Sequence, residues 1–237
     1  MKIAVVIPAA GMGRRMGTSQ PKQYLALAGR PLICHTLERF KTCESVVVVV
    51  EPERVELFRR EILGTHDFPR EWHVVAGGPE RQDSVRNGLE YVPNTCDVIL
   101  VHDGVRPLIT FALIQTVTHK AFDAGAAIVA IPTRDTIKRG VEGFVSETID
   151  RTHLWQAQTP QAFRADIIKK AFAAAYRDNF SGTDEASLVE RIGVPIALVQ
   201  GSDWNIKITT PEDLIIAESL VKQFPLLCKE GSGEVER

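Results

Sequence analysis

The segment IAVVIPAAGMGRRMGTSQPKQY, residues 3–24, decides the fold because it joins a continuous apolar run to a glycine-rich loop. Ile3 to Ile7 are apolar without alternation, as expected of a strand that is covered on both faces. The loop contains Gly11, Gly13 and Gly17, which let the backbone approach a ligand closely and expose its N–H groups. This combination predicts an open α/β sheet with an anion-binding loop at the carboxyl end of a strand.

The same alternation of apolar runs and amphipathic segments continues along the chain. Four further strands are predicted at residues 46–50, 98–101, 127–131 and 196–199. Helical spacing of apolar residues predicts helices near residues 32–40, 55–62, 85–92, 113–122 and 167–175. Alternating strands and helices favour right-handed crossovers, so the predicted fold class is α/β, with a single doubly wound, mostly parallel sheet.

One segment departs from this rhythm. Residues 132–150, PTRDTIKRGVEGFVSETID, alternate polar with apolar residues around Gly140 and Gly143, which favours an exposed two-stranded hairpin. We expect a protruding arm at about residues 132–152, within one domain that spans residues 1–227. An isolated hairpin is marginally stable, so the arm is expected to pack on a partner subunit. The charged, Gly- and Ser-bearing tail, residues 228–237, is expected to be disordered.

Composition narrows the functional class. The 237 residues are 44% hydrophobic and carry a formal net charge of -2, which argues against a nucleic-acid partner or an anionic membrane surface. The four cysteines form no CxxC pair, which disfavours a zinc site or a disulfide framework and fits a reducing cytoplasm. The first apolar run is too short for a signal peptide, and no run is long enough to span a bilayer.

The glycine-rich loop also carries Arg14, Arg15 and Lys22, and a triphosphate needs both backbone donors and positive charge. A solvated basic loop is the alternative, but open α/β sheets bind ligands at this end of a strand. The dinucleotide fingerprint of a dehydrogenase would need a third glycine where Met16 stands, and the GK[ST] of a P-loop is also missing. The loop therefore favours phosphate binding.

PAAGMGRRM from Pro8 and PKQY from Pro21 resemble the opening signature of the 2-C-methyl-D-erythritol 4-phosphate cytidylyltransferase family. Five later segments resemble the family in the same order: GGPERQDSVRNGL at 77–89, VHDGVRP at 101–107, DRTHLWQAQTPQAF at 150–163, GTDEASLVE at 182–190 and GSDWNIKITTPEDL at 201–214. Gly104-Val105 departs from the Ala-Ala that family members often carry. The resemblance implies a Rossmann-like homodimer that transfers a cytidylyl group from CTP to a small polyol phosphate.

The resemblance also implies roles for individual residues. It assigns catalysis to Arg15, Lys22, Arg151 and Lys207. Nucleotide binding falls to Ala9, Ala10, Gly11, Gly13, Gly78, Ser84, Asp103 and Gly104. The acceptor is expected to contact Arg106, Arg151, Thr159, Thr183, Asp203 and Lys207, with Arg151 reaching the site of the other subunit. Asp103 is expected to bind Mg²⁺ or another divalent cation, since one carboxylate is enough when a triphosphate supplies further oxygens.

Several of these residues have simpler interpretations when they are taken alone. Asp103 or Thr183 could cap a helix, and Arg81 is typical of a solvated helix start. His102 is expected to be structural. Thr210, followed by proline and acidic residues, predicts a helix start. Two functional alternatives also stay open: the same chemistry on ribitol 5-phosphate, and a non-catalytic module that binds CTP.

Overall fold

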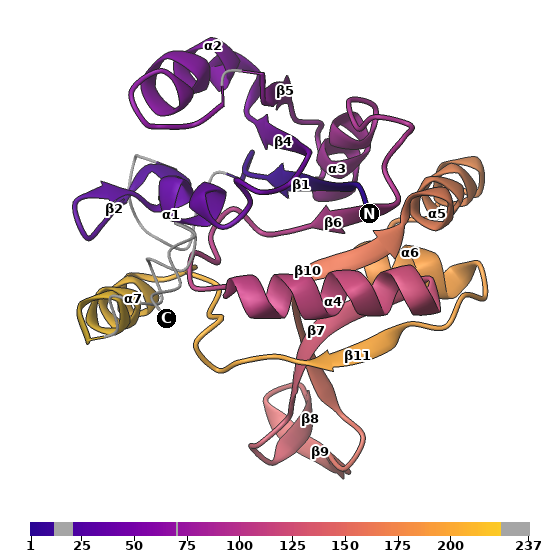
Figure 1. The fold of residues 1–237 in the computed structure, drawn as a ribbon. Coiled ribbons are helices and arrows are strands. Elements are labelled where there is room, and N and C mark those ends of the chain that lie inside the picture. Colours follow the sequence, from indigo (N-terminus) through magenta and orange to yellow (C-terminus); the bar gives the residue numbers. More distant parts are fainter. Residues whose placement is uncertain (12–20, 70, 224–237) are drawn as a thin grey trace, which may run out of the picture.

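The computed structural model describes residues 1–11, 21–69 and 71–223, and its centre is a seven-stranded sheet (Figure 1). The strand order is β11-β7-β10-β6-β1-β4-β5. These strands are β1 (Ile3–Pro8), β4 (Ser45–Val50), β5 (His73–Ala76), β6 (Val98–Val101), β7 (Ala126–Pro132), β10 (Trp155–Arg164) and β11 (Ala197–Gln200). Only β10 runs antiparallel to its neighbours β6 and β7, so the prediction of a doubly wound, mostly parallel sheet is confirmed.

Helices cover both faces of the sheet because successive strand residues point to opposite sides. One face packs Val5 and Ile7 against α1 (Leu32–Glu38), α2 (Val55–Phe58) and α4 (Phe111–Ala124). The other packs Ala4 and Val6 against α3 (Arg81–Leu89), α5 (Ala165–Arg177) and α6 (Glu185–Arg191). The unbroken apolar runs of the strands follow from this burial on both faces.

Shorter elements complete the chain. A π-helical turn, Arg59–Leu63, extends α2, and 3-10 turns occupy Lys22–Tyr24 and Pro52–Arg54. The two-residue strands β2 (Ala26–Leu27) and β3 (Arg30–Pro31) pair with each other. Their Leu27 packs with α7 (Pro211–Gln223) in a small separate cluster. Thr210 accepts a hydrogen bond from the Asp213 amide at 3.3 Å, as the predicted helix start requires.

Strand β10 was not predicted from the sequence, and its composition explains why. It contains Pro160 and several polar residues, both of which argue against an internal strand. Proline is tolerated because the pairing of β10 with β7 shifts between Ala157 and Gln161. The polar side chains of Gln158, Thr159 and Gln161 are buried and hydrogen-bonded. The four-residue β5 was also missed.

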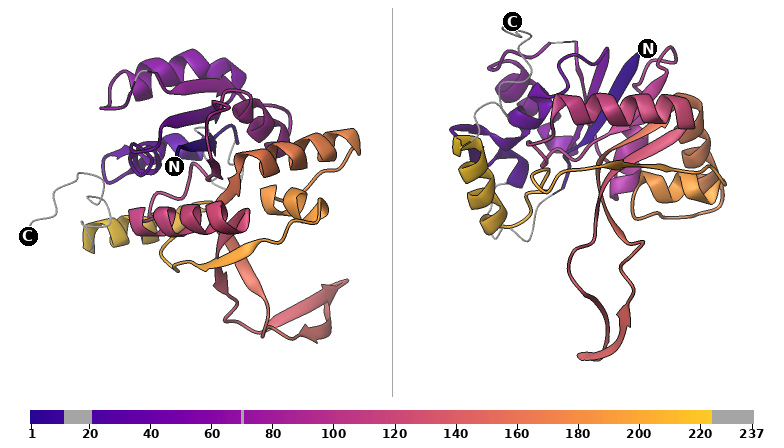
Figure 2. Two further views of the ribbon diagram at one scale, coloured as in Figure 1. Left: turned by 45° about the vertical axis from the view of Figure 1, so that its right-hand side comes forward. Right: turned by 60° about the horizontal axis from the view of Figure 1, so that its bottom comes forward.

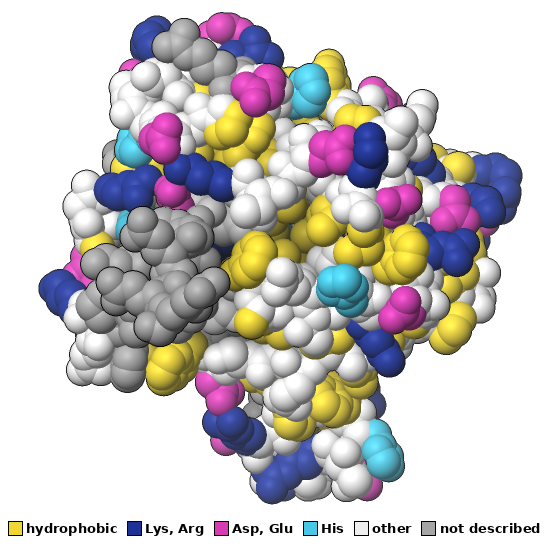
Figure 3. Space-filling model, in the orientation of Figure 1, with side chains coloured by type: hydrophobic (Ala, Val, Ile, Leu, Met, Phe, Trp, Pro, Cys, Tyr) yellow, Lys and Arg dark blue, Asp and Glu magenta, His cyan; other side chains and the backbone are white. Residues whose placement is uncertain are grey.

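The predicted hairpin arm is present as β8 (Ile137–Val141) and β9 (Phe144–Ile149). The two strands pair only with each other within the described chain, and Figure 2 shows them projecting from the body. Val141, Phe144 and Val145 are 55%, 80% and 64% exposed. In Figure 3 the arm, at the bottom, presents hydrophobic side chains beside basic ones. No helix in the described ranges is long and apolar enough to cross a bilayer.

Candidate active site

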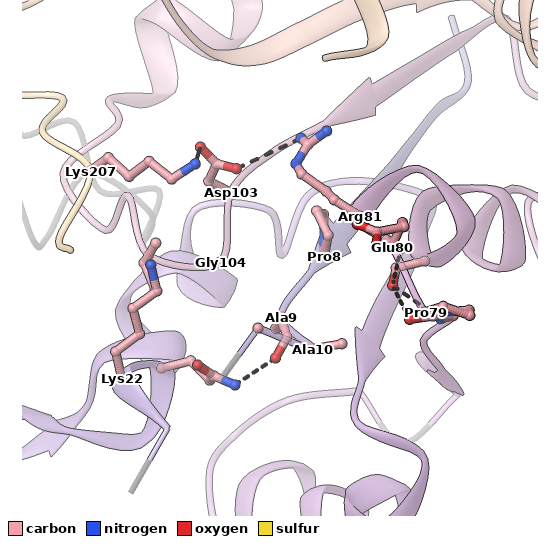
Figure 4. Close-up of a pocket in the computed structure, with 15 residues that line it drawn as sticks. Pro8, Ala9, Ala10, Lys22, Pro79, Glu80, Arg81, Asp103, Gly104 and Lys207 are labelled. Atoms are coloured by element: carbon pink, nitrogen blue, oxygen red, sulfur yellow. Dashed lines mark hydrogen bonds and ion pairs between the residues drawn. The ribbon is translucent and has the colours of Figure 1, made fainter. Parts of the chain in front are cut away.

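A pocket opens at the carboxyl ends of β1, β5 and β6. The chain passes from β1 to β4 and β5 on one side, and then returns to β6 on the other side of β1. Open α/β sheets bind their ligands at such a switch point. The pocket is lined by Pro8, Ala9, Ala10, Gly11, Lys22, Gln23, Gly78, Pro79, Glu80, Arg81, Ser84, Asp103, Gly104, Val105 and Lys207 (Figure 4). Nine of the residues to which the resemblance assigned a role lie in this lining: Ala9, Ala10, Gly11, Lys22, Gly78, Ser84, Asp103, Gly104 and Lys207.

Asp103 lies in the pocket just after β6, and three cationic side chains surround its carboxylate. Its Oδ2 is 3.0 Å from the Lys207 ammonium and 3.2 Å from Arg106 Nε, and its Oδ1 is 3.7 Å from the Arg81 guanidinium. Figure 4 shows Lys207 and Arg81 approaching the carboxylate from different elements. Burial alone would raise the pKa of Asp103, but these cations, Lys207 foremost, hold that pKa well below its usual range. Asp103 is therefore a fixed anion in a cationic setting.

Thr159 and His102 support Asp103 from behind the pocket. The Asp103 amide donates to Thr159 Oγ1 at 3.0 Å, and that hydroxyl lies 3.1 Å from His102 Nδ1. His102 Nε2 lies 3.1 Å from the Arg106 carbonyl oxygen, which can only accept. The imidazole therefore carries its proton on Nε2, and burial lowers its pKa to about 4. His102 is structural, as expected.

Arg106 also lies behind the pocket. It is buried, and its NH1 donates to the Asn205 carbonyl oxygen at 2.6 Å. In the described structure Arg106 and Thr159, both assigned to the acceptor from the sequence, contact Asp103 and do not line the pocket.

The start of α3 forms the opposite wall. Glu80 and Asp83 make a reciprocal capping box, and the Gly78 amide donates to Ser84 Oγ at 3.1 Å. Arg81 corrects the expectation of a solvated helix start, because its guanidinium donates to both oxygens of the buried Glu185 at 2.6 and 3.0 Å. Sequence spacing gave no sign of this pair, since the two residues lie 104 positions apart.

Gln23 fixes the backbone where the glycine-rich loop begins. Its amide nitrogen donates to the Ala9 carbonyl oxygen at 2.6 Å and to Glu51 Oε1 at 3.1 Å. Sequence reasoning missed both Gln23 and Glu51, although Gln23 belongs to the PKQY motif. Gly13 and Arg15 lie outside the described residues.

Three predicted acceptor residues lie away from the pocket lining. Arg151, at the base of the arm, is exposed and donates a hydrogen bond to the Arg134 carbonyl oxygen. Asp203 pairs with Arg134 at 2.5 Å. Thr183 does not cap α6; that role belongs to Asp184, whose Oδ1 accepts from the Ser187 amide at 2.9 Å. Nor does Asp103 cap α4, because Thr110 does.

The residues of the pocket fit a cation that arrives with a polyphosphate. Among residues 1–11, 21–69 and 71–223, no group of three His, Cys, Asp or Glu could form a complete metal site. Asp103 supplies one carboxylate, and its Oδ1 makes only the longer contact of 3.7 Å with Arg81. A hard cation such as Mg²⁺ keeps several waters and binds through one or two carboxylates plus phosphate oxygens, so this donor set is sufficient.

The fold and the pocket together define an α/β nucleotide-binding protein whose site is built for an anionic ligand. The family model described as 2-C-methyl-D-erythritol 4-phosphate cytidylyltransferase matches residues 3–223. A protein of that name from Syntrophotalea carbinolica is 48% identical over 93% of this chain and 97% of its own length. One from Pelotomaculum thermopropionicum is 47% identical over 98% of this chain and 99% of its own length.

Solved structures agree with this match. The crystal structure of 2-C-methyl-D-erythritol 4-phosphate cytidylyltransferase from Thermus thermophilus covers 94% of this chain and all of its own, with a TM-score of 0.78 and 32% identity. The chain therefore belongs to the 2-C-methyl-D-erythritol 4-phosphate cytidylyltransferase family. Its members are nucleotidyltransferases.

Proposed function

We propose that this chain transfers the cytidylyl group of CTP to 2-C-methyl-D-erythritol 4-phosphate, giving 4-diphosphocytidyl-2-C-methyl-D-erythritol and pyrophosphate. The observation that carries the proposal is the family match across residues 3–223, together with a cationic pocket at the switch point of the sheet. The reaction belongs to isoprenoid biosynthesis by the non-mevalonate route. Membership of this family disfavours both the ribitol 5-phosphate alternative and the non-catalytic module.

The chemistry needs placement and positive charge more than acid or base catalysis. An oxygen of the acceptor phosphate forms a bond to the α-phosphorus of CTP, the bond from that phosphorus to the bridging oxygen breaks, and pyrophosphate leaves with the electron pair. The nucleophile is already ionised at neutral pH, so no general base is required. The barrier comes largely from repulsion between anions and from charge that grows on oxygens.

The proposed residue roles come from the resemblance, and the pocket lining supports those of the residues named next. Ala9, Ala10 and Gly11 supply backbone at the triphosphate, while Gly78 and Ser84 contact the cytidine. Lys22 and Lys207 line the same pocket. There they stabilise charge on the phosphates and orient the acceptor. Asp103 would hold Mg²⁺ or another divalent cation, which supplies Lewis-acid stabilisation of the phosphate oxygens. The further roles proposed for Gly13, Arg15, Gly104, Arg106, Thr159, Thr183 and Asp203 rest on the resemblance.

The proposal includes a homodimer in the cytoplasm, assembled through the hairpin arm. Its support is the exposure of Phe144 and its apolar neighbours on a two-stranded ribbon that makes no ladder with the main sheet. Arg151 lies at the base of the same arm and is exposed. In a dimer we expect Arg151 to serve the partner's pocket, where it would orient the acceptor phosphate.

The test is release of pyrophosphate from CTP and Mg²⁺ with 2-C-methyl-D-erythritol 4-phosphate, with ribitol 5-phosphate or without acceptor. We expect release only with the first acceptor. Lys22→Ala should lower kcat/KM by at least about a hundredfold, because it removes charge that the transition state needs. Lys120→Ala, at an exposed lysine of α4, is the matched control and should be unchanged. Release with ribitol 5-phosphate alone, or a normal Lys22→Ala variant, would contradict the proposal.

A further inference from the structure

Arg81 stands between two carboxylates, and it is paired closely with only one of them. Its guanidinium makes two hydrogen bonds with Glu185, at 2.6 and 3.0 Å, and lies 3.7 Å from Asp103 Oδ1. The Arg81 side chain is 35% exposed, so it has room to turn, whereas the side chain of Glu185 is 2% exposed. The hydrogen bonds that orient the guanidinium are therefore those to Glu185 and not a contact with Asp103.

Glu185 is held in place by the segment around it. Asp184 caps the helix that Glu185 begins, and the Ala186 amide donates to Gln161 Oε1 at 3.0 Å. Gln82, next to Arg81, donates to the Phe180 carbonyl oxygen at 3.1 Å and accepts from the Gly182 amide at 2.9 Å. Gln82 thus links the start of α3 to the segment before α6, and β10 holds the first turn of α6 through Gln161, so Glu185 stays in place if the guanidinium moves.

The two oxygens of Asp103 are used differently. Oδ2 accepts from Lys207 and Arg106 at 3.0 and 3.2 Å. Oδ1 receives no hydrogen bond from residues 1–11, 21–69 or 71–223, and its 3.7 Å contact with Arg81 is beyond hydrogen-bonding distance. Oδ1 is therefore the oxygen that a cation can use. If Glu185 lost its charge, Arg81 would gain by closing on Oδ1, since a guanidinium pairs strongly with a carboxylate in a partly buried site.

We propose that Glu185 is a positioning residue that holds Arg81 away from Asp103 Oδ1 and so keeps that oxygen available to the divalent cation that accompanies the nucleotide. The inference rests on the proposed function, because it assumes a nucleotide with its cation in this pocket. It assigns no contact with substrate to Glu185. Glu185 acts through Arg81. Its charge affects how much the divalent cation strengthens nucleotide binding, and it affects nucleotide binding without metal much less.

The experiment measures CTP binding by calorimetry without acceptor, in Mg²⁺ and in metal-free buffer, and takes the ratio of the two Kd values. In Glu185→Gln we expect this metal enhancement to fall about tenfold, whereas CTP binding without metal changes little. Adding Arg81→Gln to Glu185→Gln should restore the ratio, because it removes the cation that competes for Oδ1. Any direct contact of Arg81 with CTP affects both conditions and cancels in the ratio.

Two further variants control for a merely structural role. Glu185→Asp keeps the charge but draws it back by one methylene, so it should retain the enhancement even if Glu185→Gln folds poorly. Arg191→Gln, which removes the exposed ion pair between Arg191 at the end of α6 and Asp178 after α5, should leave the ratio unchanged. Melting temperatures are measured for all variants.

The outcomes separate the inference from the function beneath it. A ratio that stays normal in Glu185→Gln, or that stays low in the double variant, overturns the positioning role while leaving the proposed function intact. Loss of the enhancement in Glu185→Asp with a normal melting temperature has the same meaning. A wild-type protein that binds no CTP under either condition overturns the proposed function and this inference together.

Discussion

The pocket and the hairpin arm differ in which kind of side chain each one buries and which kind it exposes. At the pocket, charged groups are buried and meet partners from distant elements: Asp103 faces Lys207, Arg106 and Arg81 at 3.0 to 3.7 Å. In the arm, apolar groups are exposed, with Phe144 80% accessible. The pocket thus buries charged groups that water would solvate, and the arm exposes apolar groups that burial would stabilise.

This difference indicates which part of the site one chain can complete. Buried charges need compensating partners, and those of the pocket are found within a single chain. Exposed apolar side chains on a lone ribbon gain stability only from a cover, and residues 1–11, 21–69 and 71–223 do not provide one for the arm. The carboxylate of Asp103 thus finds its cationic partners within one chain, whereas the apolar side chains of the arm stay uncovered in the described residues.

The strongest way to break the comparison is Asp103→Asn. It leaves three cations facing a neutral amide in a buried site, so we expect kcat/KM to fall by about 10²- to 10³-fold and the melting temperature to drop. The control is Asp97→Asn, which changes an exposed aspartate at the other end of β6, where the carboxylate accepts from the Lys2 amide at 2.7 Å. Equal effects of the two variants on kcat/KM would show that the buried charge has no special role.

A smaller effect is expected from Gly78→Ala. A methyl group at this position would overlap the side chain of Asp83. The loop at Gly78 must therefore shift away from Ser84 and from the start of α3, which forms this wall of the pocket. We expect CTP to bind about tenfold more weakly, as measured by calorimetry. The same change in the arm, Gly140→Ala, meets nothing closer than the Phe144 carbonyl oxygen at 3.8 Å and should leave CTP binding unaltered. Unchanged binding in Gly78→Ala would mean that the wall is more pliable than its packing indicates.

Most of the fold could be predicted from the sequence because a strand that is buried on both faces appears as a continuous apolar run. Five strands and the arm were anticipated from apolar runs and from alternation. Strand β10 was missed because its polar side chains are satisfied by residues far away in the sequence, such as Asp184 and Ser202. Periodicity reports exposure to water and cannot distinguish a solvated polar residue from one that is buried and hydrogen-bonded.

The residues of the candidate site also differ in whether their role can be recognised from nearby sequence. Residues that line the pocket from a short loop, such as Ala9, Gly78 and Asp103, stand in recognisable local motifs. The side chains of Gln23, Arg81 and Glu185 hydrogen-bond to partners 14, 28 and 104 positions away, and no local pattern records such partners. For Arg81, local helix chemistry even favoured the wrong environment.

The arm is tested by Phe144→Ser. If a second subunit covers this side chain, each of the two copies lost per dimer should weaken dimerisation by about 10- to 100-fold, which corresponds to about 1.5–3 kcal/mol for one buried phenylalanine. Sedimentation equilibrium measures the change. CTP binding to the single chain should persist, because Phe144 lies outside the pocket lining. A monomeric wild type, or a variant that associates normally, would remove the arm from the interface.

The smallest effect should come from Arg139→Gln, and it sharpens the comparison because it breaks an ion pair of the same kind as those in the pocket. Arg139 and Glu147 pair across the arm, but their side chains are 62% and 51% exposed. Water and salt screen such a pair, and holding two long side chains costs conformational entropy, so we expect a loss below about 0.5 kcal/mol, or about 1 °C in melting temperature. Thermal unfolding at low and at high salt measures it. A loss of several degrees that disappears at high salt would show that the arm stores electrostatic stability, and burial would then no longer separate the two regions.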